Sequence, residues 1–218
     1  MTGLTRSPRI LKGGLVLMDR VTGRILRSIV LQYNPEMLTR SLTVRGAGDD
    51  SDPVEALRLA GPPVETISLE AVLDATDGLE TGDGVVARVG VAADIAALET
   101  VISPSTATLA AQNALAGRGS IEVLPAEAPL VLFVWGARRI VPVRITEFSV
   151  TEEAFDPALN PIRARISLGL RALTINDLSY GSRGGALSLV QLRLKETLAG
   201  QARGGGLAAL GAEEDSFR

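Results

Sequence analysis

Carboxylates are the main residues of this chain that could do chemistry, because histidine and cysteine are both absent. Without histidine the chain lacks the commonest general base near neutral pH and the commonest nitrogen ligand for metals. Without cysteine it has no thiolate nucleophile, no disulfide and no sulfur ligand for zinc. Lysine occurs only at Lys12 and Lys195, and the many arginines do not readily lose a proton. This shortage favours a protein that is not an enzyme.

Two acidic clusters are the candidates for a hard cation, "DDSD" at 49–52 and "DATDG" at 74–78. Neither has the alternating acids and the distant glutamate of an EF-hand loop, so solvated loop acids explain both. The glycine-rich stretches lack the Walker lysine and the GxGxxG spacing, so turns explain them. A carboxylate pair for glycoside chemistry would meet only in three dimensions and stays open as an alternative. We expect no catalytic residue, no metal site and no cofactor.

Composition bounds the class of protein. The chain has 218 residues, of which 46% are hydrophobic and 22% charged, so it can bury a core. A net charge of −3 gives no overall attraction to nucleic acid or to an anionic membrane. No run of about 18 uninterrupted apolar residues predicts a membrane span, and the first residues lack a signal-peptide pattern. We therefore expect synthesis and assembly in the cytoplasm, without membrane insertion.

The first third of the chain has the pattern of β structure. The runs 14–19 and 24–33 favour strands, and the aspartate and glycine between them are typical of a hairpin turn. Asn34 and Pro35 then interrupt the ladder, because proline has no N–H to donate and restricts the residue before it. Residues 64–73 alternate between apolar and polar side chains, which predicts a half-buried strand.

The middle of the chain changes to helical spacing. Ile95, Leu98 and Ile102 predict one face of a helix over 92–102. Residues 105–117 predict a second short helix that ends at its glycine. Before these helices, the stretch 46–63 is rich in glycine, acid and proline, which predicts a mobile surface loop.

Three β segments occupy the last half of the predicted domain. Residues 130–135 are continuously apolar, which favours a strand covered on both faces, although a short buried helix stays open. Residues 140–150 return after a turn, and their change of phase predicts a bulge near Glu147. Residues 162–172 alternate most clearly, with apolar side chains on one face and arginines on the other.

The C-terminal part has the pattern of a helix followed by a tail. Leu187, Val190, Leu194 and Leu198 mark one face of a helix over 186–200, and the residues that follow predict a flexible tail. The expected fold class is mainly β within α+β, with about seven strands around one or two short helices and a helical C-terminal extension.

Trp135, the single tryptophan, has two interpretations. A core or strand-end tryptophan gives its indole N–H to a carbonyl, and this is the commoner case. An anchor at a subunit interface is the other, because tryptophan and arginine are enriched there.

Three segments resemble one family in the same order along the chain. "LQYNPEMLTRS" is similar to the N-terminal signature of contractile injection system tube-type proteins, and "ISLEAVLDATDG" is similar to their second signature. The longest match is "APLVLFVWGARRIVPVRITEFSVTEEAFDPALNPIRARISLGLRALT", with its strand ending in Trp-Gly and its Thr-Glu-Glu stretch. The resemblance covers roughly residues 14–175. It is to the tube-type domain found in baseplate hub proteins that carry a LysM module.

The resemblance implies a tail-tube-like β-barrel or sandwich that assembles as a ring, usually sixfold, in a phage-tail-like particle. It implies as partners copies of this chain, the spike protein and the tube or tube-initiator proteins of the same particle. The resemblance also implies a particle that can be released from the cell. The expected organisation is an N-terminal arm at 1–13, a tube-type domain at 14–175 and a C-terminal helix and tail at 176–218. That last segment is too short for a LysM module, so we do not expect the glycan binding that such a module would bring.

The expected function is a structural one, a baseplate hub or tube-adaptor subunit that connects the spike to the inner tube. In this hypothesis Asn34 and Pro35 set a strand corner, and arginines meet acids on neighbouring subunits. The candidate interface residues are Asn34, Pro35, Trp135, Arg144, Glu152, Glu153, Arg163, Arg165, Leu187, Val190 and Leu194. The alternatives are a solitary soluble β module that binds a ligand or glycan, and an enzyme that uses carboxylates.

Overall fold

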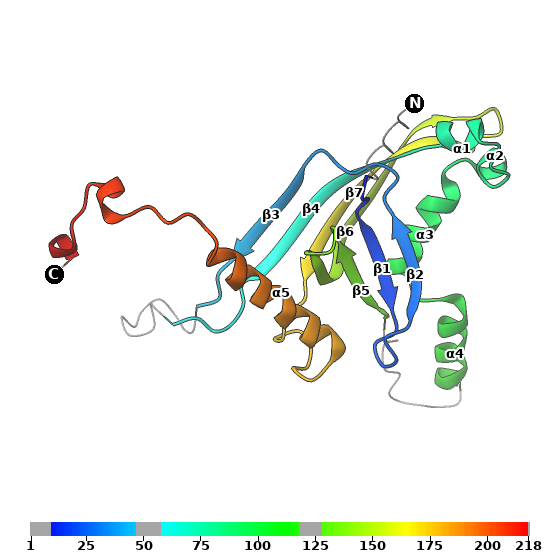
Figure 1. Cartoon of the computed structure of the whole chain (residues 1–218). Helices are drawn as coiled ribbons and strands as arrows, with labels where there is room; N and C mark the ends of the chain where they lie inside the picture. Colours follow the sequence, from blue (N-terminus) through cyan, green and yellow to red (C-terminus); the bar gives the residue numbers. More distant parts are fainter. Residues whose placement is uncertain (1–9, 47–57, 118–127, 218) are drawn as a thin grey trace, which may run out of the picture.

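A seven-stranded antiparallel sheet organises the molecule (Figure 1). The structure is a computed structural model and describes residues 10–46, 58–117 and 128–217. The strand order is β2-β1-β5-β6-β7-β4-β3. The strand bounds are β1 Gly14–Met18, β2 Ile25–Val30, β3 Leu38–Thr43, β4 Val64–Asp74, β5 Leu130–Val134, β6 Ile140–Phe155 and β7 Pro161–Ala172. The expected fold class, mainly β within α+β, is confirmed.

The sheet curls because its long strands are bulged and twisted. The register of β6 against β7 shifts between Ile145 and Glu147, which confirms the predicted bulge. Gly169 of β7 lies opposite Glu147, and a Cβ there would come 2.8 Å from the Cβ of that glutamate. The bulge therefore favours a residue without a side chain, glycine, at position 169.

The two halves of the curled sheet share one core. On β4 the side chains of Ile67, Leu69, Ala71 and Leu73 are buried, and this confirms the alternation predicted for that strand. From β7, the alternating residues Ala164 to Ala172 are buried as well. Leu15, Leu17, Leu31 and Phe133 from the other half of the sheet belong to the same cluster. The arginine-bearing face of β7 lies outside.

Four short helices follow β4. They are α1 Thr76–Glu80, α2 Val86–Val89, α3 Ala92–Ile102 and α4 Thr106–Gly117. The two predicted helices are α3 and α4. The helices α1 and α2 are too short for a helical periodicity to predict them. The buried face of α3 consists of Ile95, Leu98 and Val101. The prediction of Ile102 on that face was wrong, because Ile102 is the last helical residue and is 48% exposed. Figure 1 shows α4 standing away from the sheet, and its described residues bury no side chain.

The C-terminal helix α5, Arg183–Ala199, begins three residues before the predicted start. Ser182 explains this, because its side chain caps the helix by accepting a hydrogen bond from the N–H of Gly185 at 3.0 Å. The predicted apolar face was wrong in part, since Val190 is 54% and Leu198 44% exposed. A polar anchor, Lys195, points to the sheet instead, so hydrophobic spacing alone misplaces the packed face.

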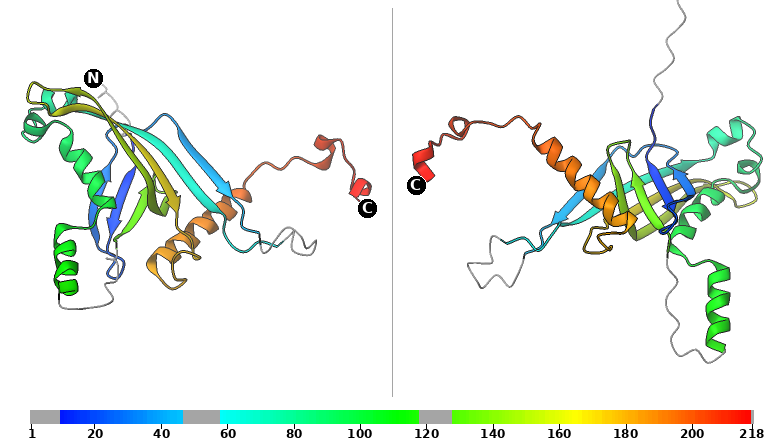
Figure 2. Two further views of the ribbon diagram at one scale, coloured as in Figure 1. Left: turned by 180° about the vertical axis from the view of Figure 1, so that it is seen from behind. Right: turned by 60° about the horizontal axis from the view of Figure 1, so that its bottom comes forward.

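The chain after α5 leads away from the body of the fold. It forms the 3₁₀ turns η1 Leu207–Leu210 and η2 Glu214–Phe217, and both views in Figure 2 show it leading away from the sheet.

The stem of the predicted loop 46–63 is closed by a bridge between Gly46 and Leu59. Residues 47–57, which include the "DDSD" cluster, lie outside the described residues, as do 1–9, 118–127 and 218. No helix among the described residues is long and apolar enough to cross a membrane.

Candidate assembly surfaces

Trp135 lies against the core at the end of β5. Its ring stacks on Phe133, with ring centroids 5.8 Å apart and an interplanar angle of 21°. Gly13 also approaches the ring so closely that a Cβ on Gly13 would overlap the indole. The turn after Trp135 is closed by its N–H, which donates to the carbonyl of Arg139 at 2.8 Å. Trp135 is thus half-buried against the core at the strand end, and its role as an interface anchor stays a prediction.

Asn34 and Pro35 lie where the chain crosses from β2 on one side of the sheet to β3 on the other. The Asn34 side-chain oxygen accepts a hydrogen bond from the N–H of Gly13 at 2.9 Å. Its amide nitrogen donates to the carbonyl of Leu11 at 2.8 Å. Asn34 therefore fixes the segment before β1 to the segment after β2, as a strand corner requires.

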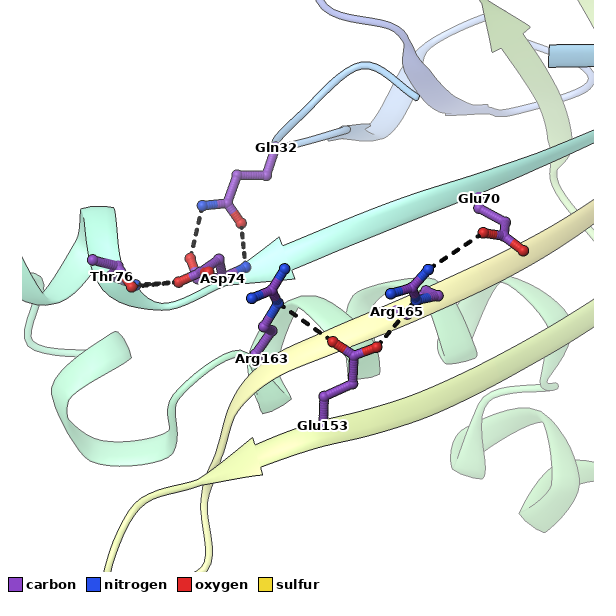
Figure 3. A network of polar contacts seen from close by, with 7 residues as sticks. All are labelled: Gln32, Glu70, Asp74, Thr76, Glu153, Arg163 and Arg165. Carbon is purple, nitrogen blue, oxygen red and sulfur yellow. Dashed lines mark hydrogen bonds and ion pairs between the residues drawn. The ribbon is translucent and has the colours of Figure 1, made fainter. Parts of the chain in front are cut away.

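Beside this corner, Gln32 joins the two ends of the curled sheet (Figure 3). Its side-chain nitrogen donates to the carbonyl of Asp74 at 2.7 Å, and its oxygen accepts from the N–H of Asp74 at 2.8 Å. The next residue, Tyr33, donates its hydroxyl to the carboxylate of Asp77 at 2.9 Å. This hydrogen bond raises the pKa of the Tyr33 phenol. The sequence did not predict the contact between Gln32 and Asp74, because a lone glutamine after a strand carries no pattern.

The "DATDG" acids have structural partners. The carboxylate of Asp74 accepts bonds from the N–H and hydroxyl of Thr76 at 2.9 and 2.5 Å, and these bonds lower the pKa of Asp74. Asp77 accepts from Tyr33. Within the described residues, no group of three or more acids forms a candidate metal cluster. The acids of this motif therefore bind the first residue of α1 and the chain after β2.

The outer face of β4, β6 and β7 carries a chain of ion pairs (Figure 3). Glu153 lies between two arginines, 3.1 Å from Arg165 and 3.4 Å from Arg163. Arg165 also reaches Glu70 at 3.8 Å. Both arginine side chains are about half exposed, so each pair contributes about 0–1 kcal/mol. Three predicted interface residues are thus brought together, within one chain.

The remaining predicted residues are spread over the surface. Arg144 and Glu152 are exposed on β6, in register with Arg171 and Ala164 of β7. Leu187 and Leu194 on α5 are half-buried. These residues do not form one cluster with the ion pairs.

A groove of about 740 Å³ lies beneath the corner. Tyr33, Asn34 and Met37 line it from the corner, and Glu70, Arg163 and Arg165 line it from the sheet. The charges that face it are largely those of the ion-pair chain. The groove is a concave surface beside the outer face of the sheet, and both charged and apolar side chains line it.

Glu65 is the buried charged residue among those described, at 6% exposure. Its carboxylate accepts from Arg40 of β3 at 2.6 Å and from Lys195 of α5 at 2.7 Å. Burial alone would raise the pKa of Glu65, but the hydrogen bonds and charges of Arg40 and Lys195 outweigh it, so the pKa is lowered. We call these three residues the Glu65 clamp. It fixes α5 beside the β3–β4 edge, and sequence spacing gave no signal for it.

The two edge strands, β2 and β3, expose apolar side chains. On β2, Ile25, Leu26 and Val30 are 52–60% exposed, and on β3 Leu42 is 49% exposed. Each of these strands has one hydrogen-bonded neighbour in the described sheet. Open edges with apolar side chains are surfaces that pair with other strands unless something protects them.

No family model matches this sequence, and no curated protein matches it. Among solved structures, a chain from the tail of an empty GTA particle with C6 symmetry is similar to this one. The identity is 12%, the TM-score is 0.28, and the likeness covers 73% of this chain and 90% of the other. A TM-score this low does not establish a shared fold or role.

Proposed function

We propose that this protein is a structural subunit of a phage-tail-like contractile injection particle. Its role there is that of a hub or tube adaptor, a ring of copies, six by the family resemblance, between the spike and the inner tube. The observation that carries the proposal is the pair of open, apolar edges at opposite ends of one sheet. The three sequence segments that resemble tube-type proteins support the same role.

Two different edges suit a ring better than a symmetric dimer. When edge β3 of one copy meets edge β2 of the next, each copy uses both surfaces once, and the contact is head-to-tail. Such contacts close into rings when the rotation between copies allows it. The contact would then bury the exposed apolar side chains of both edges. Each Å² of apolar surface removed from water stabilises the contact by about 25 cal/mol.

This role requires no catalysis. The acids of the best-defined motif serve the fold, and the outer arginines pair with acids of the same chain. The ion pairs contribute little stability because they are exposed, so apolar and backbone contacts must supply most of the ring's stability.

The test is whether the edges assemble the chain. We expect the full chain to form rings, seen by electron microscopy and by mass photometry, and to sediment with sheath, tube and spike proteins from its native source. Leu26→Lys on β2 and Leu42→Lys on β3 should each reduce the ring population, because each puts a charge into an apolar contact. Leu79→Lys on α1, at 48% exposure, is the matched control.

A stable monomer at high protein concentration would contradict the ring. In that case the groove of about 740 Å³ would favour the alternative, a solitary binding module. The edge variants would then behave like the Leu79→Lys control.

A further inference from the structure

The turn between β6 and β7 presents an exposed leucine in a strained backbone conformation. Leu159 has a φ of 65°, and among the described residues it is the one residue other than glycine with a positive φ. A bulky side chain rarely adopts this left-handed region, because its Cβ comes too close to the following carbonyl oxygen. Leu159 is also 79% exposed, so the fold gains little from its burial. Strain that burial within the fold does not offset is typical of a residue that makes a functional contact.

The turn that holds this leucine is rigid. The carboxylate of Asp156 accepts hydrogen bonds from the N–H groups of Ala158 and Asn160, both at 2.8 Å. It also accepts one from the side-chain nitrogen of Asn160 at 2.8 Å. The N–H of Leu159 donates to the carbonyl of Asp156 at 2.9 Å. Because the turn is already ordered in the single chain, little conformational entropy is lost when Leu159 binds a partner.

An apolar and an acidic side chain accompany the leucine. Phe155, the last residue of β6, is 48% exposed. We call residues 155–160 the hairpin tip, and Figure 1 shows it in yellow at the end of the molecule that carries α1 and α2. Behind the hairpin tip on β6, Glu152 is exposed, and its side chain makes no ion pair with the described residues. This end of the hairpin thus combines two exposed apolar side chains with a negative charge.

A hollow of about 500 Å³ has the complementary character. It lies where α3 ends and β5 begins, and its apolar walls include Ile102 and Val131. Arg144 lines it as well, and this exposed arginine makes no ion pair with the described residues. Two other charged residues line the hollow, Arg20 and Asp177, and both have interactions of their own. The hollow therefore offers apolar walls together with the positive charge of Arg144.

The hairpin tip cannot enter the hollow of its own chain. Ile145 lines the hollow, and a stretch of β6 separates it from Phe155. A strand rises about 3.3 Å per residue, so the two places lie about 30 Å apart along β6. An antiparallel ladder with β7 holds β6 over this length, so the strand does not fold back on itself. Contact between the hairpin tip and the hollow therefore requires two copies of the chain.

We propose that the hairpin tip of one copy inserts into the hollow of a second copy. Leu159 and Phe155 contact the apolar walls, and Glu152 faces Arg144 at the rim. The contact is head-to-tail, because the hairpin tip and the hollow are different surfaces. It uses neither β2 nor β3, so it does not rest on the proposed contact between edges. A chain with two separate head-to-tail contacts joins copies in two directions, which goes beyond a single ring.

The absence of cysteine makes a direct test possible. Leu159→Cys and Ile102→Cys are placed in two differently tagged full chains, which are co-expressed and oxidised. We expect a disulfide-linked pair that carries both tags. Leu11→Cys replaces Ile102→Cys in the control, because Leu11 is 75% exposed and precedes β1, which begins opposite the end of β5 rather than its start. A pair linked through Leu159→Cys alone would show that two hairpin tips meet each other, and would overturn the proposal.

The strained backbone gives a second test, made in chains that carry Leu42→Lys so that the edge contact contributes little. Leu159→Asn suits the left-handed conformation, because asparagine adopts it more readily than leucine. The variant should melt at the wild-type temperature or above it, while the dissociation constant from mass photometry rises about tenfold, as expected for the loss of one buried leucine. Leu159→Met keeps a large apolar side chain and should retain association. A Leu159→Asn variant that melts lower and associates unchanged would show that the leucine serves the turn alone, which contradicts the proposal.

Charge exchange tests the rim of the hollow. Glu152→Arg in the Leu159→Cys chain should cause loss of the mixed pair. Arg144→Glu in the Ile102→Cys chain should restore it, because opposite charges then face each other again. Glu36→Arg, at an exposed position before β3, is the matched control and should leave the mixed pair intact. Failure of Arg144→Glu to restore the link, in chains that melt like the wild type, would overturn the pairing of these two charges.

The outcomes separate this contact from the ring. Rings without a mixed pair would overturn the docking of the hairpin tip while the ring stands. A mixed pair in chains that carry Leu42→Lys and form no rings would establish the docking without the edge contact. A pair that forms equally well with Leu11→Cys would reflect random collision, and would overturn the docking as well.

Discussion

The side-chain amide of Gln32 pairs with the backbone of Asp74 in both directions, at 2.7 and 2.8 Å, as a neighbouring strand would. It joins the chain after β2 to the end of β4, although these strands are not neighbours in the hydrogen-bonded order. The two halves of the curled sheet are thus held together at this end by a side chain.

Gln32→Ala should lower the free energy of unfolding by about 1–3 kcal/mol, because it leaves two backbone groups of Asp74 without their partner. Urea unfolding followed by circular dichroism measures the change. Gln201→Ala, at an exposed position beyond α5, should alter stability by less than about 0.5 kcal/mol. Equal effects of the two substitutions would show that this bridge does not stabilise the fold.

The Glu65 clamp predicts a dependence of α5 docking on pH. The folded pKa of Glu65 is lowered below its ordinary value of 4.5. Its contribution to stability is therefore present above about pH 4.5 and is lost as the pH falls through the folded pKa. The protection factors of the α5 amides against hydrogen exchange, taken relative to the intrinsic rate at each pH, should fall in that acidic range before those of the β4 amides do.

Glu65→Gln should reproduce this loosening at neutral pH, with a cost of about 1–3 kcal/mol, because Arg40 and Lys195 lose the charge that they bind. Glu70→Gln is the matched change on the same strand, where the side chain is 66% exposed. It should cost no more than about 1 kcal/mol. If α5 exchange is the same in both variants, the clamp does not hold the helix.

Gly13→Ala should displace the Trp135 ring, because the added methyl group would overlap it. Trp135 is the single tryptophan, so its fluorescence reports the change directly. We expect a shifted emission maximum and a loss of about 1–3 kcal/mol in unfolding free energy. Gly84→Ala, whose added methyl group would meet no atom within 4 Å, should leave the emission unchanged. An unshifted spectrum for Gly13→Ala would refute the close approach.

Arg163→Glu combined with Arg165→Glu separates the fold from assembly. Each arginine pairs with Glu153 at a half-exposed site, so the free energy of unfolding should fall by no more than about 2 kcal/mol in total. If these arginines also contact acids of neighbouring subunits, the ring population in mass photometry should fall at a concentration where the variant is still folded. Unchanged ring formation would exclude the electrostatic part of the assembly hypothesis.

Periodicity predicted the parts of the fold whose burial follows a repeat. The alternation of β4 and β7, the helix α3 and the bulge at Glu147 follow from which side chains face the core. The face of α5 could not be predicted in this way, because a lysine bound to a buried glutamate 130 residues away determines part of its orientation.

The candidate surfaces were predictable to a lesser extent. Arg163, Arg165 and Glu153 were identified as charged residues, but their pairing within one chain depends on the register of β6 against β7. The contact of Gln32 had no sequence signal, since it arises from segments that the curling of the sheet brings together.

The sequence separation of the Glu65 clamp has a consequence for synthesis in the cell. Lys195 is translated 130 residues after Glu65. At about 5–20 residues per second, several seconds pass in which the nascent β3–β4 hairpin has its glutamate without its lysine. The sheet also requires β7 before β4 gains its second neighbour. Docking of α5 thus follows the synthesis of the β3–β4 hairpin, so a nascent chain completes the contact between β4 and α5 only after residue 195 has left the ribosome.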